Sequence, residues 1–100
     1  MPAPSVEPGD PIRIGNVPAV VADVRAEGDV VAVYLDRRGL ALAEDAVWRE
    51  AENGWAFRTP GGAAARFVDR KPGMAPYIQA LRSRHKSSVL AFPGKTKRKE

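Results

Sequence analysis

The chain has 100 residues (10.8 kDa), 44% of them hydrophobic, and a formal net charge of +4, which fits one small domain but not two independent cores. The chain has no Cys, which excludes disulfide scaffolds, thiolate zinc sites and Cys nucleophiles. It has one His, so a Ser/His triad with a second His is also excluded. The apolar runs are too short for a membrane span and the first residues resemble no secretion signal, so a cytoplasmic protein is expected.

The chain is expected to begin with a flexible arm over residues 1–10, followed by a short strand. Ile12 and Ile14 flank Arg13 in an alternating pattern that is bounded by Pro11 and Gly15. Because proline cannot donate a hydrogen bond to a neighbouring strand, this pattern predicts a strand at the edge of a sheet.

A hairpin is predicted over residues 18–35, with its turn at Glu27-Gly28. The opposite face of this hairpin carries a mixed set of residues that is typical of a sheet meeting water, and it includes Tyr34. We therefore expect Tyr34 to be exposed and available to a binding partner. The register places only apolar residues on the first face, pairing Val24 with Val31, Ala22 with Val33 and Val20 with Leu35.

The next turn, at residues 36–39, has Asp at its start and Gly where a positive φ is needed. It extends the hairpin to a three-stranded meander over residues 18–43, pairing Leu35 with Leu40 and Val33 with Leu42. Arg37 and Arg38 lie at the tip of this turn, where they are candidate contacts for a polyanion.

Residues 44–46 interrupt the alternation, and a further hairpin is predicted at Asn53-Gly54, the strongest short turn signal in the chain. A two-residue loop at this position places Trp48, Trp55 and Phe57 on one face. Since aromatic residues make up only 7% of the chain, most of them are expected in the core and not on a binding surface.

About five or six short strands within roughly fifty residues are typical of a small barrel. The strand spacing resembles that of SH3-like barrels such as Tudor and KOW modules, so a mainly β fold of this kind is expected. An OB-type barrel is the nearest alternative, although its strands usually run longer. The resemblance is one of spacing, and no functional residue is carried over from it.

Beyond Thr59 the pattern changes, and residues 63–68 are compatible with either a closing strand or a helical turn. A helix over about residues 75–86 is then predicted to cap one open end of the barrel, which gives a domain of about residues 11–86. Pro76 is tolerated in the first turn of such a helix. The helical spacing belongs to four apolar residues: Met74, Tyr77, Ile78 and Leu81.

The last third of the chain is strongly basic. Residues 71–100 carry eight Lys or Arg against one Glu, whereas residues 1–70 carry eight Arg against eleven Asp or Glu. Residues 87–100 also hold a short apolar patch and a Pro-Gly break, and they are expected to form a disordered basic tail. Such an arm is typical of proteins that bind polyanions; the alternative is a tail that only aids solubility.

Two sets of candidate contacts follow, one for nucleic acid and one for a protein partner. The first set comes from the hairpin tip, the helix and the tail: Arg37, Arg38, Arg82, Arg84, Lys86, Lys95, Lys97, Arg98 and Lys99. The second set comprises Tyr34, Val89, Leu90 and Phe92. The expected function is nucleic-acid binding with little sequence preference, for DNA or RNA. The alternative is an adaptor that docks a protein through the barrel edge or residues 89–92.

The sequence contains no pattern that predicts a reaction, a cofactor or a metal site. Gly94-Lys95-Thr96 matches the end of a phosphate-binding loop, but Val89 stands where that loop needs its first Gly. His85 has basic neighbours on both sides and is expected to contribute to a basic surface. A non-enzymatic protein is therefore expected, and an enzyme whose site forms only across an oligomer interface is a third alternative.

Overall fold

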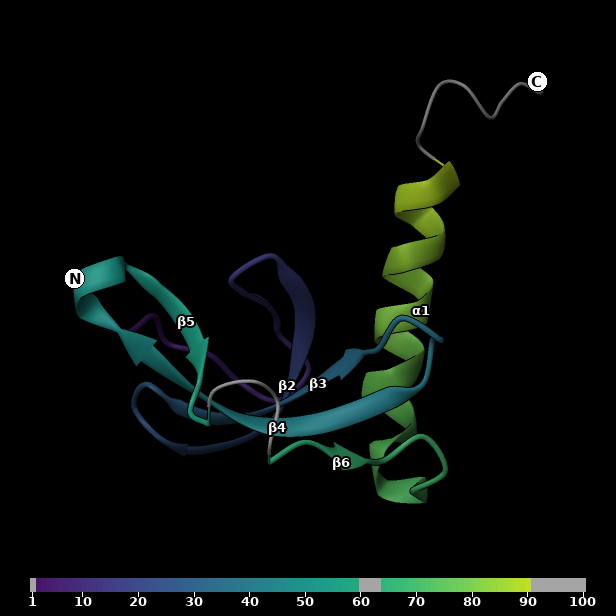
Figure 1. Cartoon of the computed structure of the whole chain (residues 1–100), viewed down its shortest axis with the longest axis horizontal. Helices are drawn as coiled ribbons and strands as arrows, with labels where there is room; N and C mark the ends of the chain where they lie inside the picture. The colour runs from purple at the N-terminus through teal and green to yellow at the C-terminus, as the bar shows by residue number, and fades with distance from the viewer. Residues whose placement is uncertain (1, 60–63, 91–100) are drawn as a thin grey trace.

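A computed structural model of the chain describes residues 2–59 and 64–90, with the backbone alone described from residue 84 to residue 90. Its elements are β1 (Pro11–Ile14), β2 (Val17–Ala26), β3 (Asp29–Leu35), β4 (Ala41–Arg49), η1 (Glu50–Glu52), β5 (Gly54–Phe57), β6 (Arg66–Phe67), η3 (Pro72–Met74) and α1 (Ala75–Leu90) (Figure 1). Within the described residues, no helix has the length and apolar character needed to cross a bilayer.

The first five strands close into a barrel. Consecutive strands pair antiparallel, and β1 completes the circle through a parallel pairing of Ile14 with Trp55 in β5. β6 pairs with the beginning of β4 at Leu42 and Ala43, so the part of residues 63–68 that is described contains a strand. The expected fold class is confirmed: the described chain is mainly β, with a closed five-stranded barrel, one extra strand and a C-terminal helix.

The strand that was expected at a sheet edge lies inside the sheet, because β1 pairs with both β2 and β5. Proline is tolerated there since Pro11 is the first residue of the strand. The preceding segment also contacts the barrel: the Gly9 N–H donates to Val21 O at 2.7 Å, and Val6 packs against the interior residues. The expected N-terminal arm therefore forms specific contacts with β2.

The β2–β3 hairpin turns at Glu27-Gly28 as expected, but the pairing slips along the strands. Val20 pairs with Val33 and not with Leu35, because two bulges in β2 each insert one unpaired residue. At Val20 the pairing is therefore shifted by two residues from the expected register, and an even shift keeps Val20 and Val33 on a common face. Between the two bulges the pairing is shifted by one residue, so Val24 pairs with Val30 and not with Val31. Val24 consequently leaves the expected core face, and it is 37% exposed.

The turn after β3 also lies where it was expected, but each residue of β3 pairs with the residue of β4 one position later than expected. The Asp36 N–H donates to Leu40 O and the Gly39 N–H donates to Asp36 O, which closes a three-residue loop with Gly39 at a φ of 82°. The expected register assumed a four-residue loop. As a result, Ala41 and Ala43 join the buried cluster beneath the helix in place of two leucines.

β4 is continuous through residues 44–46, where an interruption was expected. The expected two-residue loop at Asn53-Gly54 is also wrong, because η1 and Asn53 form the turn and Gly54 already belongs to β5. The common face of the aromatic residues is confirmed. Trp48 pairs with Trp55, their rings meet edge to face at 5.5 Å, and Phe57 packs in the same cluster.

The sheet buries residues on both of its faces. One cluster fills the barrel and draws on all five strands: Ile14, Ala19, Val21, Val30, Ala32, Ala46 and Trp55. The other lies outside the barrel between the sheet and α1: Val20, Val31, Val33, Ala41, Ala43, Val68, Ile78 and Leu81. The hairpin face that was expected to meet water is therefore the barrel interior.

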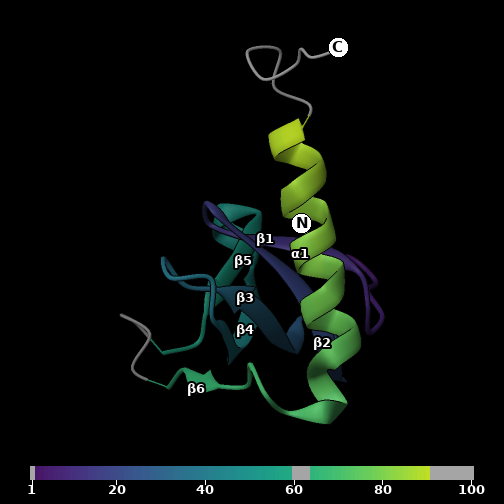
Figure 2. The ribbon, with the colours of Figure 1, turned by 90° about the vertical axis from the view of Figure 1, so that its right-hand side faces the viewer.

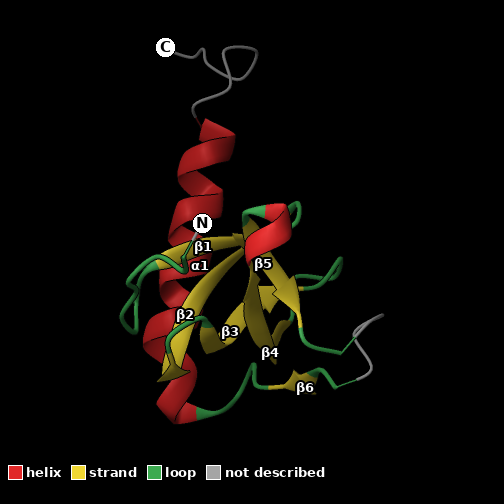
Figure 3. Cartoon of the chain, turned by 90° about the vertical axis from the view of Figure 1, so that its left-hand side faces the viewer, coloured by secondary structure: helices red, strands yellow, loops and turns green. Residues whose placement is uncertain are grey.

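α1 covers the outer face of β2 and β3 and does not cap an open end of the barrel as expected (Figures 2 and 3). Its expected spacing is confirmed, since Ile78 and Leu81 are buried and Met74 and Tyr77 pack against the same cluster. The helix continues to Leu90, past the expected end near residue 86, and its C-terminal part projects beyond the sheet (Figure 1).

We expect Val33→Ala to lower the free energy of unfolding by about 2 kcal/mol, because the lost methyl groups leave a cavity beneath the helix. Val24→Ala is the matched control and should cost about 0.5 kcal/mol or less, since this side chain is partly in water. Urea denaturation followed by Trp fluorescence measures both values. Equal losses in the two variants would place Val24 in the core and contradict the bulged register.

Candidate functional site

The structure brings together two basic regions that are far apart in the sequence. Arg37 and Arg38 lie in the loop between β3 and β4, and both are exposed. Arg82 on α1 reaches this loop, because its Nη2 atom donates a hydrogen bond to Gly39 O at 2.9 Å. The predicted hairpin tip and the predicted basic helix therefore share one surface.

Apart from Tyr34, the other predicted contacts have side chains that the structure does not describe. Arg84 and Lys86 lie in α1, where only their backbone is described. The same holds for Val89 and Leu90, which were expected in a tail after the helix. Five predicted contacts lie outside the described residues altogether: Phe92, Lys95, Lys97, Arg98 and Lys99.

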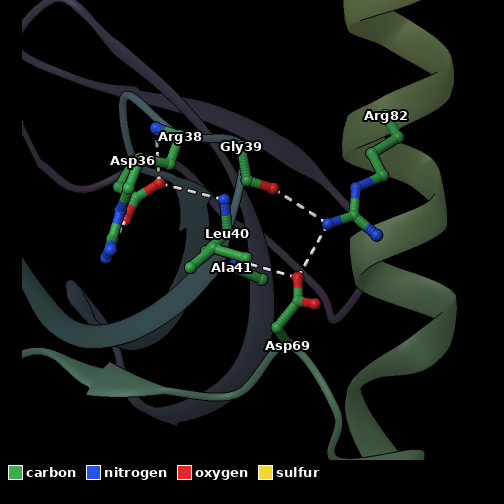
Figure 4. Close-up of polar contacts among 7 residues, drawn as sticks. All are labelled: Asp36, Arg38, Gly39, Leu40, Ala41, Asp69 and Arg82. Carbon is green, nitrogen blue, oxygen red and sulfur yellow. Dashed lines mark hydrogen bonds and ion pairs between the residues drawn. The ribbon is translucent and has the colours of Figure 1, made fainter.

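Asp36 determines the shape of the loop that carries the two arginines. Its Oδ1 atom accepts hydrogen bonds from the Arg38 N–H at 2.8 Å and the Leu40 N–H at 2.9 Å (Figure 4). Its Oδ2 atom accepts a third from Arg38 Nη2 at 3.2 Å. The Leu40 hydrogen bond, followed by those from Arg38, holds the pKa of Asp36 below its ordinary value. The charged carboxylate thus organises the loop while Arg37 stays exposed.

Asp69 and Arg82 connect the loop, the helix and the segment after β6. Arg82 Nη2 donates to Asp69 Oδ1 at 2.7 Å in addition to Gly39 O, and the same carboxylate oxygen accepts the Ala41 N–H at 3.1 Å (Figure 4). The Ala41 hydrogen bond, and then the contact with Arg82, lower the pKa of Asp69. Arg82 was predicted as a ligand contact, and the structure adds that it positions the loop.

The sequence patterns missed four exposed residues in the segment that carries Asp69: Arg66, Phe67, Arg70 and Lys71. Phe67 is 60% exposed, and the Arg38 guanidinium carbon lies 5.9 Å from the centre of its ring. A signal for them was present in the sequence, since an aromatic residue among basic neighbours is typical of nucleic-acid-binding surfaces.

These residues form what we call the basic-aromatic surface, which draws on the β3–β4 loop, β6, residues 69–71 and α1. It comprises one aromatic residue, two carboxylates and five cations: Phe67, Asp36, Asp69, Arg37, Arg38, Arg70, Lys71 and Arg82. Because its cations outnumber its carboxylates, this surface attracts anions even though residues 1–70 as a whole are acidic.

Tyr34 was expected to be exposed, but it is half-buried. Its hydroxyl donates a hydrogen bond to Glu44 Oε1 at 3.0 Å, and its ring centre lies 5.1 Å from that of Phe57. Burial, together with the hydrogen bond to Glu44, raises the pKa of Tyr34 to about 12. The Tyr34 hydroxyl therefore bonds to one oxygen of the fully buried Glu44 carboxyl group, and the other oxygen, Oε2, has no hydrogen-bond partner among the described residues.

Other arginines of the sheet are engaged in ion pairs away from this surface. Arg25 contacts Asp45 at 3.1 Å, and Arg58 contacts both Asp29 and Asp45. Pairs that are this exposed add little to the stability of a fold, because solvent screens them. They link β2, β3 and β4 and occupy two guanidinium groups that would otherwise add to a general basic surface.

A groove of about 560 Å³ lies at the other end of β4. Its lining includes Trp48 and Trp55, Pro4 and Val6 of the N-terminal segment, and Arg13. Among the side chains that the structure describes, those of residues 2–59 and 64–83, no three Asp or Glu lie close enough together to hold a metal ion.

Comparison with known proteins gave no match: no protein-family model, no curated protein and no solved structure aligns with this chain. Function is therefore inferred from the chemistry and geometry of the chain itself.

We expect Asp69→Asn to lower the melting temperature at about pH 7, because the variant removes the charge that Arg82 contacts. Folding lowers the pKa of Asp69 below its ordinary value of 3.8, so the ionised carboxyl stabilises the fold above that pH. This contribution is lost as the pH falls through the folded-state pKa.

The difference in melting temperature between the wild type and Asp69→Asn should therefore be largest near neutral pH and shrink at acidic pH. Asp23→Asn is the control, because Asp23 is exposed on β2. A difference that stays constant from about pH 7 to about pH 2.5 would contradict a role for the Asp69 charge.

Proposed function

We propose that this protein is a non-enzymatic nucleic-acid-binding module that uses the basic-aromatic surface and the basic C-terminal region. The observation that carries the proposal is the convergence of Arg37 and Arg38 with α1 through the hydrogen bond from Arg82 to Gly39. Guanidinium groups that come from separate segments but share one surface fit the repeated phosphates of a nucleic acid.

The two carboxylates of the surface reduce its charge without blocking its arginines. Asp36 pairs with Arg38 and Asp69 pairs with Arg82, yet these arginine side chains stay 69% and 48% exposed. A guanidinium has five N–H donors, so it can contact a phosphate and keep its carboxylate partner. The ion pairs are therefore compatible with phosphate binding.

The basic character continues along the chain after Arg82. Arg84 and Lys86 follow within α1, and four more cations lie between residues 95 and 99. Each cation that neutralises a phosphate releases condensed counterions, which makes the affinity dependent on salt. Contacts of this kind position a protein on nucleic acid but do not distinguish bases, so little sequence preference is expected.

A protein-binding adaptor is the second candidate, and the groove beside Trp48 and Trp55 favours it. Docking through a barrel edge has less support. Of the described strands, only β6 has a strand partner on one side alone, and it is two residues long. Strand addition requires a longer row of free backbone groups.

We expect the full-length protein to bind a labelled DNA duplex with a slope of log K against log salt of about −4 to −5. Replacing both Arg37 and Arg38 by Gln should weaken binding and flatten the slope by about one to two, because each lost phosphate contact releases about one counterion fewer. Fluorescence anisotropy titrations at several salt concentrations measure the slope.

Arg49→Gln is the matched control, because Arg49 is exposed at the opposite end of β4 from the β3–β4 loop. It should leave the slope unchanged. If the wild type binds neither duplex nor single strands at about 50 mM salt, where the attraction is near its strongest, the proposal fails and the adaptor takes its place.

A further inference from the structure

Phe67 is an aromatic side chain that the fold leaves on the surface. It is 60% exposed, whereas the next residue, Val68, is 2% exposed and belongs to the core. Alternation from β6 into Val68, the residue that follows the strand, explains why the two side chains differ in burial, but it does not explain why the outward position carries a large apolar ring. Among the described residues, Val24 at 37% is the other large apolar residue that is exposed.

The surroundings of this ring are basic. The Arg38 guanidinium carbon lies 5.9 Å from the ring centre, within the range of a cation–π contact. Arg70 and Lys71 follow shortly after Phe67 in the sequence, and both are exposed. An apolar protein surface would meet this patch with a large desolvation penalty, whereas an anionic ligand with flat rings would complement both of its features.

We propose that Phe67 is a stacking platform for an unpaired base, so that the module prefers single-stranded nucleic acid. The base stacks on the Phe67 ring, and the neighbouring phosphates lie against Arg37 and Arg38. The inference rests on the proposed function, since it names the form of nucleic acid that the basic-aromatic surface recognises.

The preference for a single strand follows from which faces of a base are accessible. In a duplex each base is stacked on both sides and offers only its edges, so a ring on the protein surface reaches phosphates and grooves but no base face. In a single strand a base face is free to pack on an aromatic ring. Stacking of this type tolerates any base, in agreement with the low sequence preference expected from phosphate contacts.

The test compares the full-length wild type with Phe67→Leu and Phe67→Trp. Each protein is titrated by fluorescence anisotropy against a labelled single-stranded DNA of about 12 nucleotides and against the matching duplex, at about 50 mM salt. Leu keeps an apolar side chain but removes the flat ring, whereas Trp keeps a stacking surface. Melting temperatures measured in parallel verify that the variants fold, which the exposure of Phe67 favours.

We expect Phe67→Leu to weaken single-strand binding about tenfold and duplex binding by a much smaller factor, because a duplex offers no base face to the ring. Phe67→Trp should retain wild-type affinity for the single strand. The Arg37→Gln/Arg38→Gln variant, in contrast, should weaken binding to both ligands, because phosphates are present in both.

The possible failures can be distinguished from one another. If Phe67→Leu leaves single-strand binding unchanged, or weakens single-strand and duplex binding equally, the stacking inference is overturned while the proposed nucleic-acid function stands. If the wild type binds neither ligand, the proposed function fails and the stacking inference fails with it; Phe67 would then be a candidate contact for a protein.

Discussion

The burial of β3 on both faces is the constraint on which the rest of this structure depends. Val30 and Ala32 face the barrel interior, while Val31 and Val33 face the cluster beneath α1, and none of the four is more than 5% exposed. A strand of this kind needs apolar cover on each side, because every buried methylene stabilises the fold by about 0.8 kcal/mol. Barrel closure supplies one cover and the helix supplies the other.

The candidate site is a consequence of this double burial. Ile78 and Leu81 place α1 against the outer face of the sheet, and Arg82, the next residue, is thereby brought to the β3–β4 loop. The small side chains of Ala41 and Ala43 occupy the same cluster at the start of β4, next to that loop. Core packing thus places the helix arginine beside the loop arginines, and hydrogen bonds then hold them together.

Local chemistry made some of these features predictable and concealed others. The turn at residues 36–39 was predicted because the Asp36 side chain and a positive φ at Gly39 specify it within a few residues. The bulges in β2 were not predicted, because they have no compositional signal and because the expected register assumed that one face of the hairpin meets water. Arg37, Arg38 and Arg82 were predicted singly. Their convergence depends on Asp69, a contact between distant segments, and Phe67 was missed because residues 63–68 had no assigned element.

The charge of the domain shows why the arrangement of ion pairs matters more than their number. Arg25 and Arg58 contact carboxylates within the sheet, where they cross-link strands. Arg38 and Arg82 also contact carboxylates, but these partners orient the guanidinium groups on the surface and leave them accessible. An arginine that is already oriented loses less conformational entropy when it meets a phosphate. A carboxylate at such a site therefore lowers the net charge while it reduces the entropic cost of binding, so an acidic body can still present an ordered basic surface.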